Sequence, residues 1–232
     1  MRELAAYHRW IRVHYVYPSA EADSLVNLMG EGLVLPYLDV PLQHVNPQIL
    51  RAMKRPGNIE KTLRAIENWR RICPDLAIRS TFITGFPGET QEQFNELLSF
   101  QKEAKLDRVG CFPYSDVDGA AANAYLNPVD EQLREERAGI LMDVQAQISK
   151  EKLAKRIGKE YQVLIDYVDD EGNAVGRSKY EAPDVDGLIV IENAKGVNPG
   201  DFVQAKITEA DEHDLKASLI NISESQISFK QN

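Results

Sequence analysis

Two hydrophobic patterns alternate along the first half of the chain. Four segments rich in aliphatic and aromatic residues predict strands: 11–17, 33–40, 76–84 and 108–114. Four intervening segments with apolar residues at helical spacing predict helices: 21–30, 47–55, 59–72 and 91–104. Strands that alternate with helices favour right-handed βα units around a parallel sheet.

The second half of the chain follows a different pattern. A loop at 115–129 precedes a long helix predicted from about 131 to 156, whose inward face includes Arg137 and which Gly158 ends. Five short apolar segments separated by turn residues then predict strands: 161–168, 174–179, 187–192, 202–209 and 214–220. Five such strands favour a small closed barrel of the OB type. The predicted fold class is therefore α/β plus all-β.

The composition is that of a globular protein. Apolar residues make up 43% and charged residues 27% of the 232 residues, which excludes a disordered chain, a fibre and a disulfide scaffold. No apolar run reaches the ~18 residues of a membrane span, and the N-terminus lacks the pattern of a signal peptide. We therefore expect a cytoplasmic protein with no membrane partner. Its two cysteines, Cys73 and Cys111, are too few for a four-thiolate iron–sulfur cluster and lack metal-ligand spacing, so no metal site is expected.

Acidic residues are concentrated in the last part of the chain. Residues 159–221 contain six Lys and Arg against fourteen Asp and Glu, a net charge of −8 out of −9 for the whole chain. Such a surface repels phosphates and favours a basic partner. A surface that serves only solubility is the alternative interpretation.

The segment RSTFITGFPGET, residues 79–90, has the densest pattern of candidate site residues. A predicted strand leads into a turn with two glycines and a proline, and Thr90 with Gln93 forms a capping box that begins the next helix. Ligands of parallel βα folds bind at the carboxyl ends of the strands, where glycines let the backbone approach closely. The segment is either such a site or a plain tight turn.

Other candidate residues follow from the same strand ends. In DVPLQH, residues 39–44, Gln43 and His44 end a predicted strand on the same side of the sheet. Arg79 lies within a strand expected to be buried, so it needs an anion, which is either an internal Asp or Glu, such as Asp39, or a ligand carboxylate. Phe112 and the other strand aromatics fit core packing, and stacking on an adenine is the alternative.

Four motifs together resemble the radical S-adenosylmethionine methylthiotransferases: WIRVHYVYP, YLDVPLQH, RSTFITGFPGET and LDRVGCFPYS. The segment from GKEYQVLID to DLKAS resembles the TRAM domain of that family, so the resemblance spans about residues 10–219. It implies strands three to six of a radical SAM (β/α) barrel, followed by an OB-like TRAM barrel. The implied domains are 1–128 for the partial barrel, 129–157 for the connecting helix, 158–222 for TRAM and 223–232 for a tail.

The resemblance also implies cofactors and roles for the candidate residues. The family uses S-adenosylmethionine and two 4Fe-4S clusters. By analogy, Thr84, Gly85 and Glu89 shape the adenosyl pocket, and Phe112 lies near the adenine. Gln43, His44 and Arg79 then line the polar end of the ligand.

The chain departs from the family in what it lacks. Neither the CxxxCxxC loop nor the further cluster cysteines of the N-terminal domain occur in it. We therefore expect the chain to be a fragment, inactive alone, with an exposed apolar sheet edge that promotes self-association.

The substrate class is argued from charge. Within the family, the resemblance is to the branch that adds a methylthio group to the β-carbon of an aspartate in small-subunit ribosomal protein S-twelve. An acidic TRAM domain fits this basic protein and argues against RNA. Two alternatives remain: a non-catalytic module that binds a basic protein, and a fragment of an enzyme that methylthiolates adenosine in transfer RNA.

Overall fold

The structure is a computed structural model that describes residues 2–7, 9–55, 57–119, 121–125 and 127–222. The predicted tail, 223–232, lies outside these residues. The chain forms two compact units, each assembled from separate segments. The described residues of Val13–Asn27 and Leu38–Ile148 form one unit, and those of Met1–Arg12, Leu28–Tyr37 and Ser149–Asn232 form the other.

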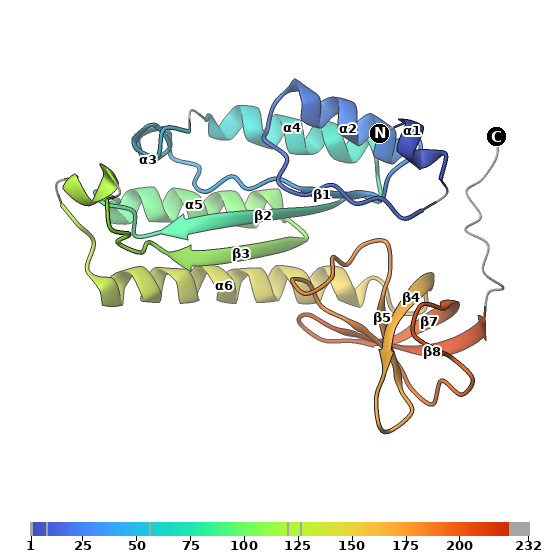
Figure 1. The fold of residues 1–232 in the computed structure, drawn as a ribbon. Helices are drawn as coiled ribbons and strands as arrows, with labels where there is room; N and C mark the ends of the chain where they lie inside the picture. The colour runs from blue at the N-terminus through green and yellow to red at the C-terminus, as the bar shows by residue number, and fades with distance from the viewer. Residues whose placement is uncertain (1, 8, 56, 120, 126, 223–232) are drawn as a thin grey trace. The chain divides into compact units, whose positions relative to one another are not determined.

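A three-stranded sheet in the order β1-β2-β3 is the centre of the first unit (Figure 1). Its strands are β1 (Tyr37–Asp39), β2 (Ala77–Thr84) and β3 (Arg108–Pro113). Strands β2 and β3 are parallel, with Arg79 opposite Arg108 and Thr84 opposite Pro113. The parallel arrangement predicted for these segments is therefore correct.

The strand predicted at 11–17 is absent, and only Val13 forms a parallel bridge, to Leu38. Tyr15 has a φ of 58°, which ends any extended run at that point. Its backbone N–H donates to the Asp39 carboxylate at 3.3 Å instead of to a strand. The strand predicted at 33–40 is likewise reduced to the three residues of β1.

Helices connect these strands, and most begin or end at the expected signals. They are α1 (Arg2–Ala5), α2 (Ala20–Gly30), α3 (Pro47–Ala52), α4 (Ile59–Ile72), α5 (Gln91–Ala104) and α6 (Glu131–Ala154), with a 3₁₀ turn, η1, at Ala121–Ala124. Asn58 caps α4, and Thr90 with Gln93 forms the predicted capping box of α5. No helix among the described residues is long and apolar enough to cross a membrane.

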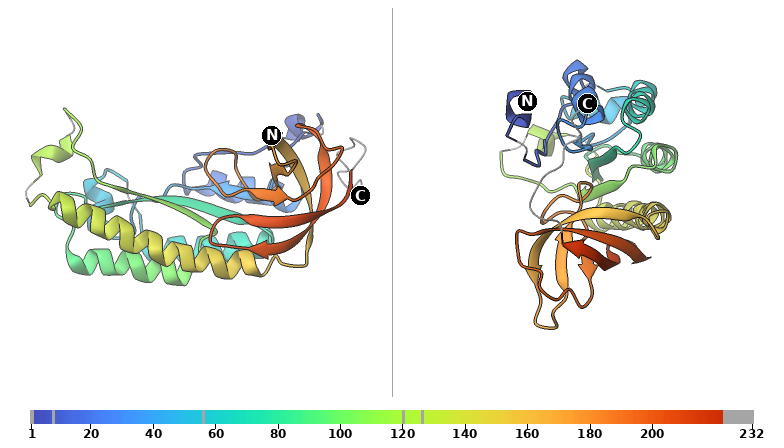
Figure 2. Two further views of the ribbon diagram at one scale, coloured as in Figure 1. Left: turned by 90° about the horizontal axis from the view of Figure 1, so that it is seen from below. Right: turned by 90° about the vertical axis from the view of Figure 1, so that its right-hand side faces the viewer.

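The two faces of the sheet differ in burial. Helices α4 and α5 lie on one face (Figure 2), where Ile78 and Phe82 of β2 are fully buried. Phe82 packs edge-on against Phe100 of α5 with ring centroids 6.2 Å apart, a separation typical of favourable aromatic pairs. The alternate residues of β2, among them Arg79, Thr81 and Ile83, are only partly buried. The opposite face is therefore the open face of the sheet.

The second unit contains a closed five-stranded barrel. Its strands are β4 (Glu160–Val168), β5 (Ala174–Arg177), β6 (Ile189–Ile191), β7 (Phe202–Ala210) and β8 (Leu215–Ile222), which close in the order β4-β5-β6-β8-β7. Strands β6 and β8 pair in parallel, and the other pairs are antiparallel. The predicted small barrel with five strands is confirmed.

The N-terminal segment packs on this barrel. Arg12 donates to the carbonyls of Lys179 and Glu181, at 3.3 and 2.7 Å. Its guanidinium also lies over the Tyr37 ring, 4.3 Å from the centroid. Trp10 packs edge-on against Phe202 at 5.0 Å. The first residues of the chain are thus part of the same unit as its last strands.

Candidate functional site at the carboxyl edge of the sheet

All seven residues predicted for the site lie in the unit that contains the three-stranded sheet. They separate into two groups. Arg79, Gln43 and Phe112 are wholly or partly accessible to solvent, whereas His44, Thr84, Gly85 and Glu89 are buried. Only the first group can be reached by a ligand without a change in the protein.

Asp39 organises the open face of the sheet. Its carboxylate, 1% exposed, lies 3.5 Å from Arg79 Nη1 and 3.2 Å from His14 Nδ1. Asp39 is therefore one partner of Arg79, which was one of the two alternatives from the sequence. The Arg79 side chain stays 17% exposed. His14 was missed, although it alternates with the aliphatic residues of IRVHYVY.

Gln43 has a backbone conformation that needs support. Its φ is 67°, in the left-handed region that most residues avoid. Two hydrogen bonds to β2 hold it: the Gln43 N–H donates to Thr81 O, and the Ile83 N–H donates to Gln43 O, both at 2.8 Å. The side chain of Gln43 is partly exposed beside the end of β2.

Phe112 projects from β3 and is 60% exposed. It pairs in register with Ile83 of β2, so the two side chains lie on the same open face. Core packing, one of the two sequence alternatives for Phe112, does not account for this exposure. The ring is available for stacking.

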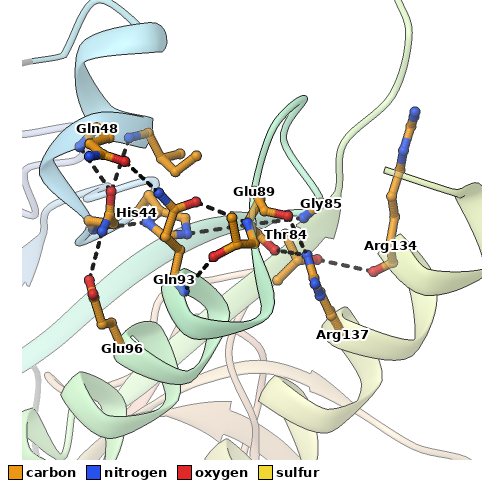
Figure 3. Close-up of polar contacts among 12 residues, drawn as sticks. His44, Gln48, Thr84, Gly85, Glu89, Gln93, Glu96, Arg134 and Arg137 are labelled. Carbon is orange, nitrogen blue, oxygen red and sulfur yellow. Dashed lines mark hydrogen bonds and ion pairs between the residues drawn. The ribbon is translucent and has the colours of Figure 1, made fainter. Parts of the chain in front are cut away.

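Glu89, Arg137 and His44 form a buried ionic cluster (Figure 3). Glu89 receives Arg137 Nη1 on Oε1 at 2.6 Å and the Gly85 N–H on Oε2 at 3.1 Å. His44 Nε2 lies 3.3 Å from the same Oε2, and the side chains of His44 and Glu89 are both 0% exposed. Arg137 extends from α6 and was not predicted as a site residue.

Thr84 and Gly85 form the start of the turn after β2. Thr84 Oγ1 donates to Arg134 O at 3.2 Å. Gly85 has a φ of 69°, and a Cβ at this position would lie 2.3 Å from Arg134 Cγ. Only glycine fits here, because helix α6 approaches the turn too closely for a side chain.

Cys111 lies on the covered face of β3, where its Sγ is 3.8 Å from Thr84 Oγ1. Burial raises the pKa of the Cys111 thiol to about 11, against a smaller lowering by the Thr84 hydroxyl. Cys111 is therefore protonated at neutral pH, which suits neither a nucleophile nor a metal ligand.

Polar side chains tie α3 to α5 beside the cluster. Asn46 Nδ2 donates to Glu96 at 2.8 Å, and Gln93 Nε2 donates to Gln48 at 2.9 Å. Asn46 also caps α3 through its side-chain oxygen. These contacts fix the segment that follows β1, which includes Gln43 and His44.

Two protein-family models match the chain. Residues 1–100 match the radical SAM superfamily, and residues 157–220 match the TRAM domain. Ribosomal protein uS12 methylthiotransferase RimO of Shewanella amazonensis is 53% identical over 96% of this chain and 47% of its own length. The enzyme of the same name from Aromatoleum aromaticum is 57% identical over 90% of this chain and 47% of its own length.

The chain is a relative of the RimO methylthiotransferases. The RimO of Aeromonas hydrophila gives the same result, at 55% identity over 94% of this chain and 49% of its own length. The chain thus spans about half the length of the RimO relatives that it matches. Among solved structures, coproporphyrinogen III oxidase (HemN) from Escherichia coli matches 83% of this chain and 45% of its own, with 13% identity and a TM-score of 0.47; this likeness is too low to bear on function.

The radical SAM family implies two kinds of cofactor, an iron–sulfur cluster and S-adenosylmethionine, and the residues of this chain fit only the second. An iron–sulfur cluster with four thiolates does not fit its two cysteines, of which Cys73 is buried and Cys111 has a raised pKa. Among the described residues, no group of three or more His, Cys, Asp or Glu side chains could hold a metal ion. S-adenosylmethionine does fit, because the open face offers the cation of Arg79, the amide of Gln43 and the exposed aromatic ring of Phe112.

Proposed function

We propose that this chain is part of a RimO-type methylthiotransferase that adds a methylthio group to the β-carbon of an aspartate in ribosomal protein uS12. The observation that carries the proposal is 53–57% identity to RimO enzymes over 90–96% of the chain. The clusters that the family requires find no ligands here, so the chain alone is expected to be inactive.

The open face of the sheet would bind S-adenosylmethionine in this enzyme. Arg79 and Gln43 would contact its polar end, and the exposed ring of Phe112 would stack near its adenine. When bound and reduced, S-adenosylmethionine supplies a carbon radical able to abstract hydrogen from an unactivated C–H bond. The residues of this chain would bind and orient it, and the packed sheet behind them would exclude water.

The acidic TRAM barrel would recognise a basic protein. Its exposed acids, such as Asp170, Glu212 and Glu209, lie on turns and strands of the closed barrel. A negative surface attracts a basic ribosomal protein and repels RNA phosphates.

A hybrid protein tests the proposed reaction. The segment of the Shewanella amazonensis RimO that matches this chain is replaced by residues 1–232, and the hybrid is expressed in a strain that lacks its own RimO. Mass spectrometry of uS12 should show the added methylthio group on one aspartate. A folded hybrid that carries both clusters and leaves uS12 unmodified would contradict the proposal.

Transfer RNA is the competing substrate, and the same strain tests it. Nucleoside analysis of its transfer RNA should show no methylthioadenosine that depends on the hybrid. RNA modification without uS12 modification would replace the proposed substrate with RNA.

A further inference from the structure

We propose that His44, Glu89 and Arg137 form a buried ionic clamp that positions the S-adenosylmethionine site without touching the ligand. The clamp depends on the proposed function only for the identity of that ligand. It assigns a role to Arg137, and it makes His44 and Glu89 positioning residues rather than the ligand contacts suggested by family analogy.

Burial separates the clamp from the ligand. The side chains of His44 and Glu89 are 0% exposed, and that of Arg137 is 4% exposed. A ligand on the open face therefore cannot reach their charged groups in this structure.

Glu89 is the centre of the clamp because its carboxylate joins three elements. Arg137 of α6 donates both to its Oε1 at 2.6 Å and to its backbone carbonyl at 3.2 Å. The Gly85 N–H, at the end of β2, donates to its Oε2. A carboxylate is costly to bury unless such partners neutralise it, so the turn after β2 is fixed to α6.

His44 adds the segment that follows β1. Its Nδ1 accepts the Asn46 N–H at 2.9 Å, so the proton of the neutral ring lies on Nε2. That Nε2 lies 3.3 Å from Glu89 Oε2 and has no other polar partner among the described residues. The ring thus lies within ion-pair distance of the carboxylate, without a hydrogen bond to it (Figure 3).

The clamp residues lie next to the residues that a ligand can reach. His44 directly follows Gln43, and Gly85 comes two residues after Ile83, which is in register with Phe112. If the carboxylate loses a partner, the turn after β2 and the segment that follows β1 shift, and Gln43, Ile83 and Phe112 shift with them. Small displacements of this kind are enough to weaken binding strongly.

Affinity for S-adenosylmethionine, measured by equilibrium dialysis on the hybrid without reductant, tests the clamp. We expect Arg137→Met to raise the Kd by roughly ten- to a hundredfold. The double variant Arg137→Met/Glu89→Gln should bind more tightly than Arg137→Met, because the introduced amide oxygen still accepts the Gly85 N–H and no unpaired charge stays buried. If Glu89 touches the ligand, the double variant binds no better than Arg137→Met, and the clamp is wrong.

Kinetic measurements distinguish a positioning role of Arg137 from a general loss of stability. The KM for S-adenosylmethionine should rise in Arg137→Met while the KM for uS12 stays unchanged. Gln145→Leu is the matched control: Gln145 is buried on the same helix and donates to Leu106 O at 3.2 Å, away from the sheet edge. It should lower the melting temperature and leave the Kd unchanged; an equal rise in Kd would show that any loss of stability weakens binding.

Two further outcomes are decisive. If Arg137→Met does not fold, Arg137→Lys keeps the charge and loses the fork geometry, and it should give an intermediate Kd. Wild-type affinity in either Arg137 variant would overturn the clamp.

A hybrid that binds S-adenosylmethionine but leaves uS12 unmodified would contradict the proposed function and still allow the clamp to be tested.

Discussion

At the scale of single residues, charge pairing explains most of the candidate site. Asp39 accepts hydrogen bonds from Tyr15 N and from Arg79, and it lies within ion-pair distance of His14. Glu89 accepts hydrogen bonds from Arg137 and from the Gly85 N–H, and it lies within ion-pair distance of His44. Each carboxylate is buried and each is surrounded by donors, which is the condition under which buried charge is tolerated.

Asp39→Asn should lower the free energy of unfolding by about 1–3 kcal/mol, because Arg79 loses a buried carboxylate partner. Denaturant unfolding followed by Trp69 fluorescence, in a chain whose Trp10 is replaced by Phe, measures this loss. Adding Arg79→Met to Asp39→Asn should recover part of it. Strictly additive losses would mean that the two side chains are not coupled.

Cys111 should resist alkylation. Because burial raises its thiol pKa to about 11, little thiolate is present at neutral pH, and iodoacetamide should label it much more slowly than free cysteine. Labelling is counted by mass spectrometry of peptides from the native chain, with urea-unfolded chain as the control. Labelling of the native protein at the unfolded rate would contradict the assigned environment.

At the scale of elements, local signals were sufficient for α4 and α5 and insufficient for the two strands predicted at 11–17 and 33–40. The bounds of α4 and α5 match the prediction, because Asn58 and the Thr90–Gln93 capping box act within one helical turn. The strand predicted at 11–17 failed because the Asp39 carboxylate, twenty-four residues away, holds Tyr15 out of an extended conformation. Sequence patterns do not contain such a distant contact.

Local sequence signals also predicted only part of the candidate site. Strand-end position identified Gln43, His44 and Phe112, but it did not distinguish buried from exposed side chains. Arg137 had a signal, since it interrupts the inward face predicted for the long helix, and a charged residue there requires a buried partner. Its partner, Glu89, lies forty-eight residues earlier, so only the fold could pair them.

The turns of the barrel make its stability sensitive to acid. Backbone N–H groups of Asp214 and His213 donate to Asp211, between β7 and β8, and lower the pKa of its carboxyl. Asp169, between β4 and β5, also has a lowered pKa, from hydrogen bonds with Asn173. A lowered pKa in the folded state gives stability that is present above the unfolded pKa of about 3.9 and is lost as the pH falls below it.

We therefore expect the barrel to lose stability below about pH 4, and Asp169→Asn/Asp211→Asn to lose less over the same interval. Thermal unfolding between about pH 3 and 6, followed by Trp10 fluorescence in a Trp69→Phe background, measures the difference. Parallel curves for the two proteins would show that these turns do not cause the acid sensitivity.

At the scale of the whole molecule, each compact unit contains one of the two tryptophans. Trp69 is buried on α4, with its Nε1 2.6 Å from Asp23, and Trp10 packs on Phe202 of the barrel. Single-tryptophan variants can therefore report on the two units separately.

Arg12→Ala should destabilise the barrel unit by about 1–3 kcal/mol, because it removes two hydrogen bonds to backbone carbonyls and the stacking on Tyr37. The Trp10 transition should move to lower denaturant, and the Trp69 transition should move less. Arg64→Ala is a matched control, since Arg64 forms an exposed pair with Glu60, and it should leave both transitions in place. Equal shifts of both signals after Arg12→Ala would mean that the units unfold together.

The order of synthesis affects when Trp10 and Arg12 can make their contacts with the barrel unit. Strand β4 can pair with β7 only after β7 has been synthesised. The barrel closes only when β8 has paired with both β6 and β7. Trp10 and Arg12 leave the ribosome well before Phe202 and Glu181, the residues on which they pack. Until those residues are made, Trp10 lacks its partner Phe202 and Arg12 lacks its two carbonyl acceptors, so these contacts depend on late, non-local pairing, which is the slow kind of folding step.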